Sequence, residues 1–240
     1  MKKALIIGAS SGIGAALAKV LAEDYDVIGL ASRRTERLEA LAVEIGKTTY
    51  IATIDVSEPD QATDKMNALI EQMGGVDLAV ICAGTGFMNT ELTWEPERQT
   101  IDVNVYGFTC LADTLINQFI AQGYGHLVGI SSVAALRGSG ACPAYNASKA
   151  YVSNYLEGLR VKARQSSKEI IVTDIKPGFV DTPMAQGDGL FWVASPETAA
   201  KQIGRLIRRR KAHGYVTQRW RIIAIILKLI PRRLYARLPM

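Results

Sequence analysis

Side chains that bind metals or form disulfides are scarce in this sequence of 240 residues. It contains three cysteines, Cys82, Cys110 and Cys142, and two histidines, His126 and His213. The cysteines lie far apart, outside the close spacings of zinc sites, and an odd number suits a reducing compartment better than a set of disulfides. The histidines have no evident ligand partners. We therefore expect no metal site and a cytoplasmic location.

The N-terminus lacks a long apolar run, although its first residues have the order of charged and apolar residues found in a signal peptide. Two lysines precede the apolar stretch Ala4–Ile7, which is followed by three glycines within seven residues. A secretory signal needs about 7–15 apolar residues in its central region. We therefore expect this segment to form a strand, a turn and a helix that stay in the mature protein.

Acidic residues are absent after Glu197. Residues 1–200 carry 16 Lys and Arg against 23 Asp and Glu, a balance of −7, whereas residues 201–240 carry 12 Lys and Arg and no acid. The net charge of +5 therefore comes from the C-terminal tail. The acidic balance of the main body argues against general nucleic-acid binding.

The sequence is rich in apolar residues, at 48%, which is enough for a large core. Short runs rich in Val and Ile, with little polar alternation, are typical of strands buried on both faces of a parallel sheet. These runs cover residues 4–8, 26–32, 49–54, 77–83, 126–131 and 170–176, and helix-like stretches cover 12–23, 34–45, 58–73, 97–121 and 144–165. The alternation predicts an α/β fold with a doubly wound, Rossmann-like parallel sheet. We expect one domain, residues 1–218, followed by a tail, residues 219–240.

The stretch GASSGIG, residues 8–14, follows the first apolar run and opens the first helix. Glycine lets the backbone turn sharply and approach a pyrophosphate closely, and a helix N-terminus offers free N–H groups to the anion. The spacing of Gly8, Gly12 and Gly14 is G-x-x-x-G-x-G, which differs from the commoner G-x-G-x-x-G of dinucleotide sites. With a strand before it and a helix after it, the loop indicates dinucleotide binding rather than an ordinary turn. Ser10, Ser11 and Ile13 belong to this expected site.

The end of the second apolar run bears on the choice between NAD and NADP. An acid there would hold the ribose 2′-hydroxyl of NAD, whereas arginine suits the 2′-phosphate of NADP. The sequence has Arg33 and Arg34 at this point, so we expect NADP(H), unless the arginines are only solvated at the start of a helix. Asp55, after the third run, has two interpretations: it accepts from an adenine amino group, or it caps the next helix, for which Ser57 competes.

These features and several later motifs resemble the short-chain dehydrogenase/reductase family in its single-domain form, from residue 4 to about residue 217. The order and separation of the motifs agree with the family. They comprise Gly8–Gly14, Asp55-Val56, Cys82-Ala83-Gly84, Asn104, Ser132, Tyr145-x-x-x-Lys149 and Pro177–Met184. Cys82 stands where the family often has Asn, a change that removes no catalytic group.

The resemblance implies that Ser132, Tyr145, Lys149 and Asn104 are catalytic. Tyr145 would exchange a proton with the substrate oxygen, and Lys149, one helical turn away, would lower its pKa and hold the nicotinamide ribose. Ser132 would orient the substrate oxygen. Asn104 would support a proton path to Lys149.

Further cofactor contacts implied by the resemblance are at Val56, Ala83, Gly84, Pro177, Gly178, Val180 and Thr182. Some roles have an alternative. Ser131 rather than Ser132 could supply the hydroxyl, and Asn104 could be a helix residue that only bonds backbone. Tyr151 and Tyr155 are expected to pack or face solvent.

The implied activity is NADP(H)-dependent interconversion of a carbonyl and a secondary alcohol. Two alternatives are a catalytically silent NADP-binding scaffold and an extended-form sugar-nucleotide epimerase. The silent protein would typically lack Ser132, Tyr145 or Lys149, and the epimerase needs a larger C-terminal domain than the residues after Pro177 offer. The resemblance also implies a homo-oligomer, either a dimer or a tetramer.

The segments 136–143 and 179–195 are expected to border the substrate pocket. Phe179, Met184, Leu190, Phe191 and Trp192 make the second segment apolar, and Arg137 is the one arginine in the two segments. We therefore expect an apolar carbonyl substrate.

The tail contains an apolar run, residues 222–230, interrupted only by Lys228. It is too short to span a membrane, which takes about 20 residues, and Pro231 would end a longer helix. An apolar helical face formed by Ile222, Ile225, Ile226, Leu229 and Ile230 has two interpretations. One is a helix at the surface of an anionic membrane, on its inner face. The other is a helix packed on a second subunit or on the enzyme, where its apolar face would also cover an apolar substrate pocket.

Overall fold

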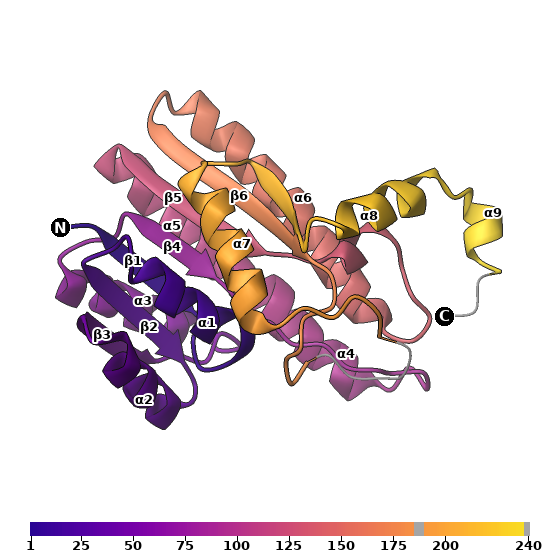
Figure 1. Cartoon of the computed structure of the whole chain (residues 1–240), viewed down its shortest axis with the longest axis horizontal. Helices are drawn as coiled ribbons and strands as arrows, with labels where there is room; N and C mark the ends of the chain where they lie inside the picture. Colours follow the sequence, from indigo (N-terminus) through magenta and orange to yellow (C-terminus); the bar gives the residue numbers. More distant parts are fainter. Residues whose placement is uncertain (185–189, 238–240) are drawn as a thin grey trace.

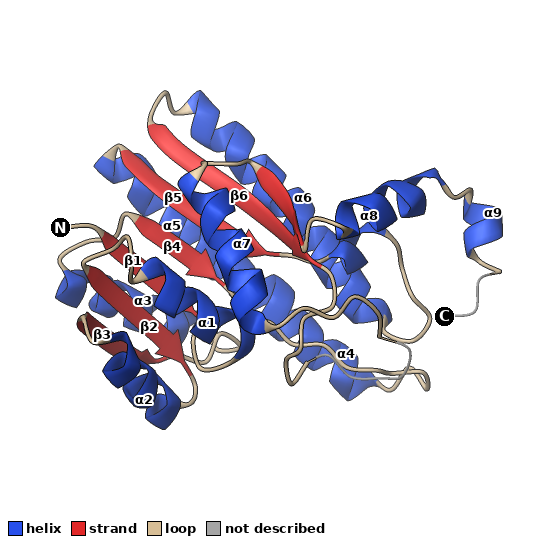
Figure 2. Cartoon of the chain, in the orientation of Figure 1, coloured by secondary structure: helices blue, strands red, loops and turns tan. Residues whose placement is uncertain are grey.

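A computed structural model describes residues 1–184 and 190–237 of the chain. A single sheet of parallel strands runs through it in the order β3-β2-β1-β4-β5-β6-β7. The strands are β1 (Lys3–Ile7), β2 (Val27–Ser32), β3 (Thr48–Thr53), β4 (Leu78–Ile81), β5 (Tyr124–Ile130), β6 (Glu169–Pro177) and β7 (His213–Val216). The strand arrows all point the same way in Figure 2. The doubly wound, Rossmann-like α/β fold expected from the sequence is confirmed.

Helices connect the strands and cover both faces of the sheet (Figure 1). They are α1 (Gly12–Leu21), α2 (Thr35–Ile45), α3 (Pro59–Met73), α4 (Trp94–Ile101), α5 (Phe108–Gln122), α6 (Pro143–Gln165), α7 (Pro196–Arg208), α8 (Trp220–Leu229) and α9 (Arg232–Tyr235). A π-helix, η1 (Asp102–Gly107), joins α4 to α5, and a short 3-10 helix, η2 (Val133–Leu136), follows β5.

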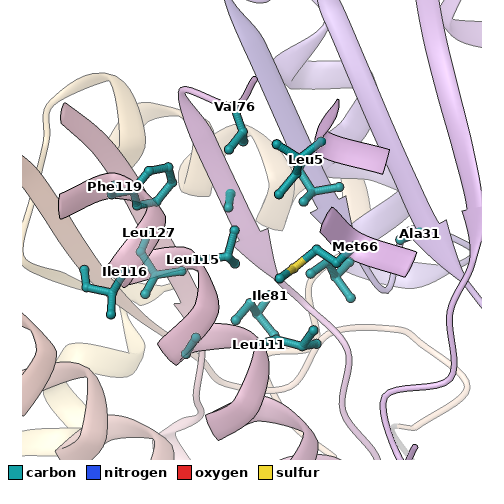
Figure 3. Packing of buried hydrophobic residues seen from close by; sticks show 14 of the residues in the cluster. Leu5, Ala31, Met66, Val76, Ile81, Leu111, Leu115, Ile116, Phe119 and Leu127 are labelled. Atoms are coloured by element: carbon teal, nitrogen blue, oxygen red, sulfur yellow. The ribbon is translucent and has the colours of Figure 1, made fainter. Parts of the chain in front are cut away.

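The core consists of two apolar layers, one on each face of the sheet. Leu5 and Ile7 of β1 belong to the layer under α3, α5 and α6, part of which appears in Figure 3. Ala4 and Ile6 point the other way and pack with α1, α2 and α7. Because alternate residues of a strand face opposite sides, a strand buried on both faces must be apolar throughout. That requirement explains the unbroken apolar runs in the sequence.

The sequence predicted most elements to within a few residues, with three differences. The single helix expected over 97–121 is divided into α4, η1 and α5, because the chain widens into a π-turn where Gly107 meets the backbone of Val56. Helix α7 and strand β7 were not expected. The start of α7 did carry a signal: Ser195 caps it by accepting a hydrogen bond from the Thr198 N–H at 3.2 Å, and Pro196 opens it.

The tail forms two helices separated at Pro231, as its position in the sequence predicts. Ile230 lies outside α8 in an extended conformation, so the apolar face of the helix has four of the five expected members. In Figure 1, α8 and α9 project beyond the carboxyl edge of the sheet. Among the described residues, no helix has the length and apolar character needed to cross a bilayer.

The strand order reverses between β1 and β4. From β1 the chain adds β2 and β3 toward one edge of the sheet, and it then returns to add β4 to β7 toward the other edge. Parallel sheets bind ligands outside the carboxyl ends of their strands at such a point. The segments that follow β1, β2, β4, β5 and β6 all leave the sheet at this edge, and they contain the residues that the sequence analysis selected.

Candidate active site

The glycine loop after β1 is held tightly against the end of β4. Gly8 has a φ of +93°, and a Cβ on it would lie 2.5 Å from the Ala83 nitrogen. A Cβ on Gly14 would lie 2.2 Å from the Gly8 oxygen. Only glycine fits either position, because a side chain would overlap backbone atoms. The loop therefore brings bare backbone to the start of α1, where helix N–H groups can face an anion.

Thr182 lies across this loop from the β6 side. A Cβ on Gly12, whose φ is +54°, would lie 2.8 Å from the Thr182 Cγ2. Two segments far apart in the sequence thus meet at the N-terminus of α1. Ser10, Ser11 and Ile13 are half-buried in the same loop.

The two arginines after β2 differ in their contacts. Arg34 donates from Nη2 to the hydroxyls of Ser10 and Ser11, at 2.8 Å each. Arg33 has a side chain 72% exposed, and its guanidinium lies 3.9 Å from the Asp55 carboxylate. Partial burial, followed by repulsion from Arg37 and Arg33, lowers the pKa of Arg34. Arg33, Arg34 and Arg37 thus place positive charge beside the glycine loop.

Asp55 holds the turn after β3 rather than capping a helix. Its Oδ1 accepts from the Ser57 N–H at 3.0 Å and from the Ser57 hydroxyl at 2.7 Å. The N-cap of α3 is Glu58, so the capping role considered for Asp55 and Ser57 is wrong. Val56 is buried, and a Cβ on Gly107 would lie 1.9 Å from its carbonyl oxygen.

The residues after β4 lie between the glycine loop and the expected catalytic groups. The N–H groups of Cys82 and Ala83 donate to the Ile7 carbonyl at 2.8 and 2.9 Å. A Cβ on Gly84 would lie 3.2 Å from the Lys149 Nζ. Burial raises the pKa of the Cys82 thiol to about 12, so Cys82 is a neutral thiol at physiological pH.

Tyr145 and Lys149 both lie on α6 and face this edge of the sheet. The Lys149 Nζ is 5.8 Å from the centroid of the Tyr145 ring and donates to the Ile130 carbonyl at 3.0 Å. The Tyr145 ring packs on Gly86, where a Cβ would lie 2.4 Å from the ring Cδ2. Contacts of both residues with the segments after β4 and β5 therefore fix the position of the pair.

The two adjacent serines after β5 have different hydrogen-bond partners. Ser131 bonds the Asp174 carboxylate and donates to the Ile175 carbonyl at 3.1 Å, so it ties β5 to β6. Ser132 accepts from the Ala134 N–H at 3.1 Å and donates to the Pro177 carbonyl at 3.3 Å, and its side chain lies close enough to Tyr145 to act on the pKa of the phenol. The hydroxyl beside the tyrosine is therefore that of Ser132.

Burial dominates the acid–base properties of the pair. It lowers the pKa of Lys149 to about 8, against the opposing attraction of Cys82 and Asp174. It also raises the pKa of Tyr145, although the hydrogen bond with Ser132 acts in the opposite direction. This direction is opposite to the one expected from the lysine alone. In the protein by itself, Tyr145 is therefore a neutral phenol at physiological pH.

Asn104 is buried in the π-helix η1. Its Oδ1 accepts from the Thr85 N–H at 2.8 Å. Its Nδ2 donates to the Thr85 carbonyl at 2.7 Å and to the Ser148 hydroxyl at 2.9 Å. The side chain thus joins η1, the segment after β4 and α6 beside Gly84. Thr85, Ser148 and Gly86 were not found from the sequence, because no spacing marks a partner so distant along the chain.

The other two tyrosines of α6 lie apart from this cluster. Tyr151 and Tyr155 stack with their ring centroids 5.5 Å apart. The Tyr151 hydroxyl is 2.8 Å from the Thr109 hydroxyl, and Tyr155 bonds the Asp113 carboxylate. Both have partners on α5, so they join two helices.

The segment after β6 packs against the start of α8. A Cβ on Gly178 would lie 2.0 Å from the Trp220 Cε2, so the indole lies directly on the backbone that follows Pro177. Val180 is buried and forms an isolated bridge with Ala194. Trp220 belongs to the tail, residues 219–240, which the sequence analysis set apart from the domain. Its contact with Gly178 depends on the fold and has no sequence signal.

Aromatic rings gather beside this contact. The centroids of Phe179 and Phe191 lie 5.2 and 5.1 Å from that of Trp220, and Trp192 lies 6.1 Å from it. We call these four residues the aromatic cluster. Met184 is exposed and Leu190 half-buried, while residues 185–189 of the expected pocket border lie outside the described residues.

Arg137, in the other segment of the expected pocket border, is engaged by the tail. Its Nε donates to the Leu227 carbonyl at 2.8 Å, its Nη2 bonds the Ile230 carbonyl, and its guanidinium lies 5.2 Å from the Tyr235 ring centroid. This arginine therefore caps the C-terminal end of α8.

Within residues 1–184 and 190–237, no group of three or more His, Cys, Asp and Glu side chains is arranged to hold a metal ion.

Comparisons with known proteins agree with this geometry. A family model described as short chain dehydrogenase matches residues 2–189. An uncharacterized oxidoreductase of Myxococcus xanthus is 34% identical over 241 residues, which cover 98% of this chain and 94% of the relative.

Solved structures share the fold of this chain. A short-chain dehydrogenase from Sphingobium yanoikuyae, in complex with NADPH, superposes with a TM-score of 0.82 at 22% identity, covering 100% of this chain and 97% of that one. A variant of actinorhodin polyketide ketoreductase with NADPH gives 0.76 at 25% identity, covering 86% and 90%.

Proposed function

The chain belongs to the short-chain dehydrogenase family, whose members are oxidoreductases, and on that premise we propose that it is an NADP(H)-dependent enzyme that interconverts a carbonyl and a secondary alcohol. The observation that carries this proposal is the placement of Tyr145, Lys149 and Ser132 around one point. That point adjoins Gly84, at the carboxyl edge of the sheet beside the glycine loop.

The residues at this edge suit a nicotinamide dinucleotide phosphate. Gly8 and Gly14 let the loop pack closely on the backbone after β4 and on itself, because a Cβ at either position would overlap backbone atoms, and the start of α1 favours a pyrophosphate. Arg33 and Arg34 suit the additional 2′-phosphate of NADP, because they concentrate positive charge there. When bound, this cofactor would give or take the hydride.

The remaining cofactor contacts come from the segments after β3, β4 and β6 and from α6. We propose that they are Asp55, Val56, Ala83, Gly84, Pro177, Gly178, Val180, Thr182, Tyr145 and Lys149, together with the loop residues Ser10, Ser11, Gly12 and Ile13.

The chain's own residues supply the proton and the orientation. As a neutral phenol, Tyr145 is in the right state to donate a proton to the oxygen of a carbonyl undergoing reduction. The Lys149 ammonium favours the phenolate that this transfer leaves behind. Ser132 donates a hydrogen bond that orients the same oxygen. Asn104 holds the segment that carries Gly84 and so positions this group of residues.

The substrate we propose is apolar. The aromatic cluster lies beside the segment after β6, and Arg137 is occupied by backbone carbonyls of the tail rather than free to bind a carboxylate. A silent NADP-binding scaffold is the alternative within the same fold. The presence of Ser132, Tyr145 and Lys149 together favours the enzyme.

We also propose a homo-oligomer, a dimer or tetramer, because members of this family often associate. A cytoplasmic location is proposed from the three free cysteines, since thiols persist in reducing compartments.

Replacing Tyr145 with Phe tests the mechanism. The purified variant should bind NADPH like the wild type, measured by nucleotide fluorescence, because the ring is kept. It should lose about a hundredfold to ten-thousandfold in turnover of a panel of apolar ketones, followed by NADPH consumption, because the proton donor is gone.

The matched control is Tyr151→Phe, on the same helix but bonded to Thr109, which should retain turnover. Near-normal turnover in Tyr145→Phe would overturn the mechanism. A wild type that binds NADPH but reduces none of the panel would favour the scaffold. Activity confined to small charged ketoacids would contradict the apolar substrate.

A further inference from the structure

Helix α8 presents an apolar face to solvent. The side chains of Ile222, Ile225, Ile226 and Leu229 are 58%, 50%, 48% and 76% exposed. Their spacing of three and four residues places them on one side of the helix. Four large aliphatic side chains exposed together on one helix form a patch, which is more informative than single exposed apolar residues.

The orientation of this face is set by contacts on the opposite side of the helix. Trp220 and Ala224 are buried against the enzyme, with Trp220 lying on Gly178. Arg137 holds the C-terminal end of α8, and the Tyr235 hydroxyl donates to the Gly138 carbonyl at 2.7 Å. The helix is therefore anchored by one side, and the side chains of its apolar face are exposed.

Positive charge borders the apolar face. Arg221 and Lys228 lie on one flank of α8, about a quarter-turn from the centre of the apolar side, given about 100° per residue. Arg232, Arg233 and Arg237 follow in and after α9 and are exposed. No acidic residue occurs after Glu197 to neutralise them.

This charge distribution distinguishes between two partners that could cover the apolar face, a second copy of the chain and a lipid bilayer. A symmetric contact between two copies of this face would cover the aliphatic side chains but would supply no acidic partner from either tail for the cations, because residues 201–240 contain no Asp or Glu. An anionic bilayer satisfies both parts of the surface, since the aliphatic side chains enter the headgroup boundary while the cations meet lipid phosphates.

We propose that the apolar face of α8, with its flanking basic residues, docks on the surface of an anionic lipid bilayer. The helix lies in the plane of the interface and does not cross it. Phe191 and Trp192, which lie beside Trp220 at the start of α8, are 47% and 39% exposed. Arg219, whose guanidinium lies 5.2 Å from the Trp192 ring centroid, adds a cation there. Rings of this kind are favoured at membrane interfaces.

Co-sedimentation of the full-length protein with vesicles tests this proposal. We expect binding to an equal mixture of phosphatidylcholine and phosphatidylglycerol, weakened by added salt, and little binding to phosphatidylcholine alone. The double variant Ile225→Glu with Leu229→Glu should bind at least about tenfold more weakly, because both side chains leave the interface. The triple variant Arg221→Gln, Lys228→Gln and Arg233→Gln should lose about a hundredfold, at about fivefold per charge.

The control variant introduces two glutamates on other helices. Val43→Glu with Val161→Glu changes two exposed aliphatic residues on α2 and α6 and should leave binding unchanged. Negligible wild-type binding to both kinds of vesicle would overturn the proposal. A change from dimer to monomer in the Ile225→Glu, Leu229→Glu variant, measured by analytical ultracentrifugation without vesicle binding by the wild type, would assign the face to a second copy instead. None of these outcomes depends on catalytic activity.

Discussion

Ser131 and Ser132 are neighbours in the sequence, but their hydroxyls have different partners. Both hydroxyls contact β6, Ser131 at Asp174 and Ile175 and Ser132 at the Pro177 carbonyl, but Ser132 is the one that lies beside Tyr145. Adjacent side chains at the end of a strand point to opposite sides, so only one of them can reach α6. At the scale of single residues, the direction in which each serine side chain leaves the end of β5 therefore decides which of the two hydroxyls lies in the candidate site.

Arg34 should contribute to NADPH affinity more than a typical surface arginine. We expect Arg34→Ala to raise the Kd for NADPH about tenfold to a hundredfold, because the charge-assisted hydrogen bond that we propose to the 2′-phosphate would be lost. The Kd for NADH should change little. Titration of nucleotide fluorescence measures both constants. Arg98→Ala, at an exposed arginine paired with Glu95 and Asp102, is the control and should change neither.

The pKa of Lys149 predicts how carbonyl reduction depends on pH. Burial lowers this pKa to about 8, so the ammonium is charged below that pH and is lost as the pH rises through it. Because the charge favours the phenolate formed by proton donation, kcat/KM for reduction should fall above about pH 8. The pH profile at saturating NADPH measures this limb. A profile that stays level to about pH 10 would contradict the role of Lys149.

Among the elements, the π-helix η1 has the clearest structural cause and consequence. Gly107 lets the chain pass against the Val56 carbonyl, and the widened turn carries Asn104 to its three hydrogen bonds. π-turns inside helices are often found at functional sites. The sequence predicted a continuous helix here, because a glycine within an apolar helical pattern gives no indication of what backbone lies beside it.

A pair of glycine substitutions tests this account. Gly107→Ala should lower the free energy of unfolding by about 2 kcal/mol or more, because its Cβ would lie 1.9 Å from the Val56 oxygen. Gly158→Ala, on the exposed side of α6 with open space around its Cβ position, should raise it by about 0.5–1 kcal/mol. Urea unfolding measures both. Equal effects of the two substitutions would contradict the close approach at Gly107.

At the scale of the whole molecule, one buried histidine links folding to pH. His126 on β5 lies 2.8 Å from the Thr173 hydroxyl, which itself donates to the Lys211 carbonyl at 2.6 Å. Since the threonine proton is used there, the His126 Nε2 donates to Thr173. Burial, and then repulsion from Arg210, lower the pKa of His126 to about 4, so it is neutral in the folded protein.

Stability should therefore fall in mild acid. The unfolded chain binds a proton at His126 near pH 6.5, whereas the folded protein resists protonation until about pH 4. The unfolded state binds more protons between these values, so the free energy of unfolding falls as the pH drops, by up to about 3 kcal/mol. Urea unfolding at several pH values should give this slope. His126→Gln should flatten it, and His213→Gln, at an exposed position, should preserve most of it.

The sequence by itself determined the strand–helix alternation, the glycine loop and the spacing of Ser132, Tyr145 and Lys149. Each depends on local properties: burial of a strand on both faces, the turn that glycine permits, and one turn of helix. The tertiary structure alone decided that Trp220 lies on Gly178, that Arg34 reaches Ser10 and Ser11, and that η1 widens at Gly107. It also raised rather than lowered the pKa of Tyr145. These features depend on contacts between segments far apart in the chain and on removal of charge from water, and no short stretch of sequence records either of them.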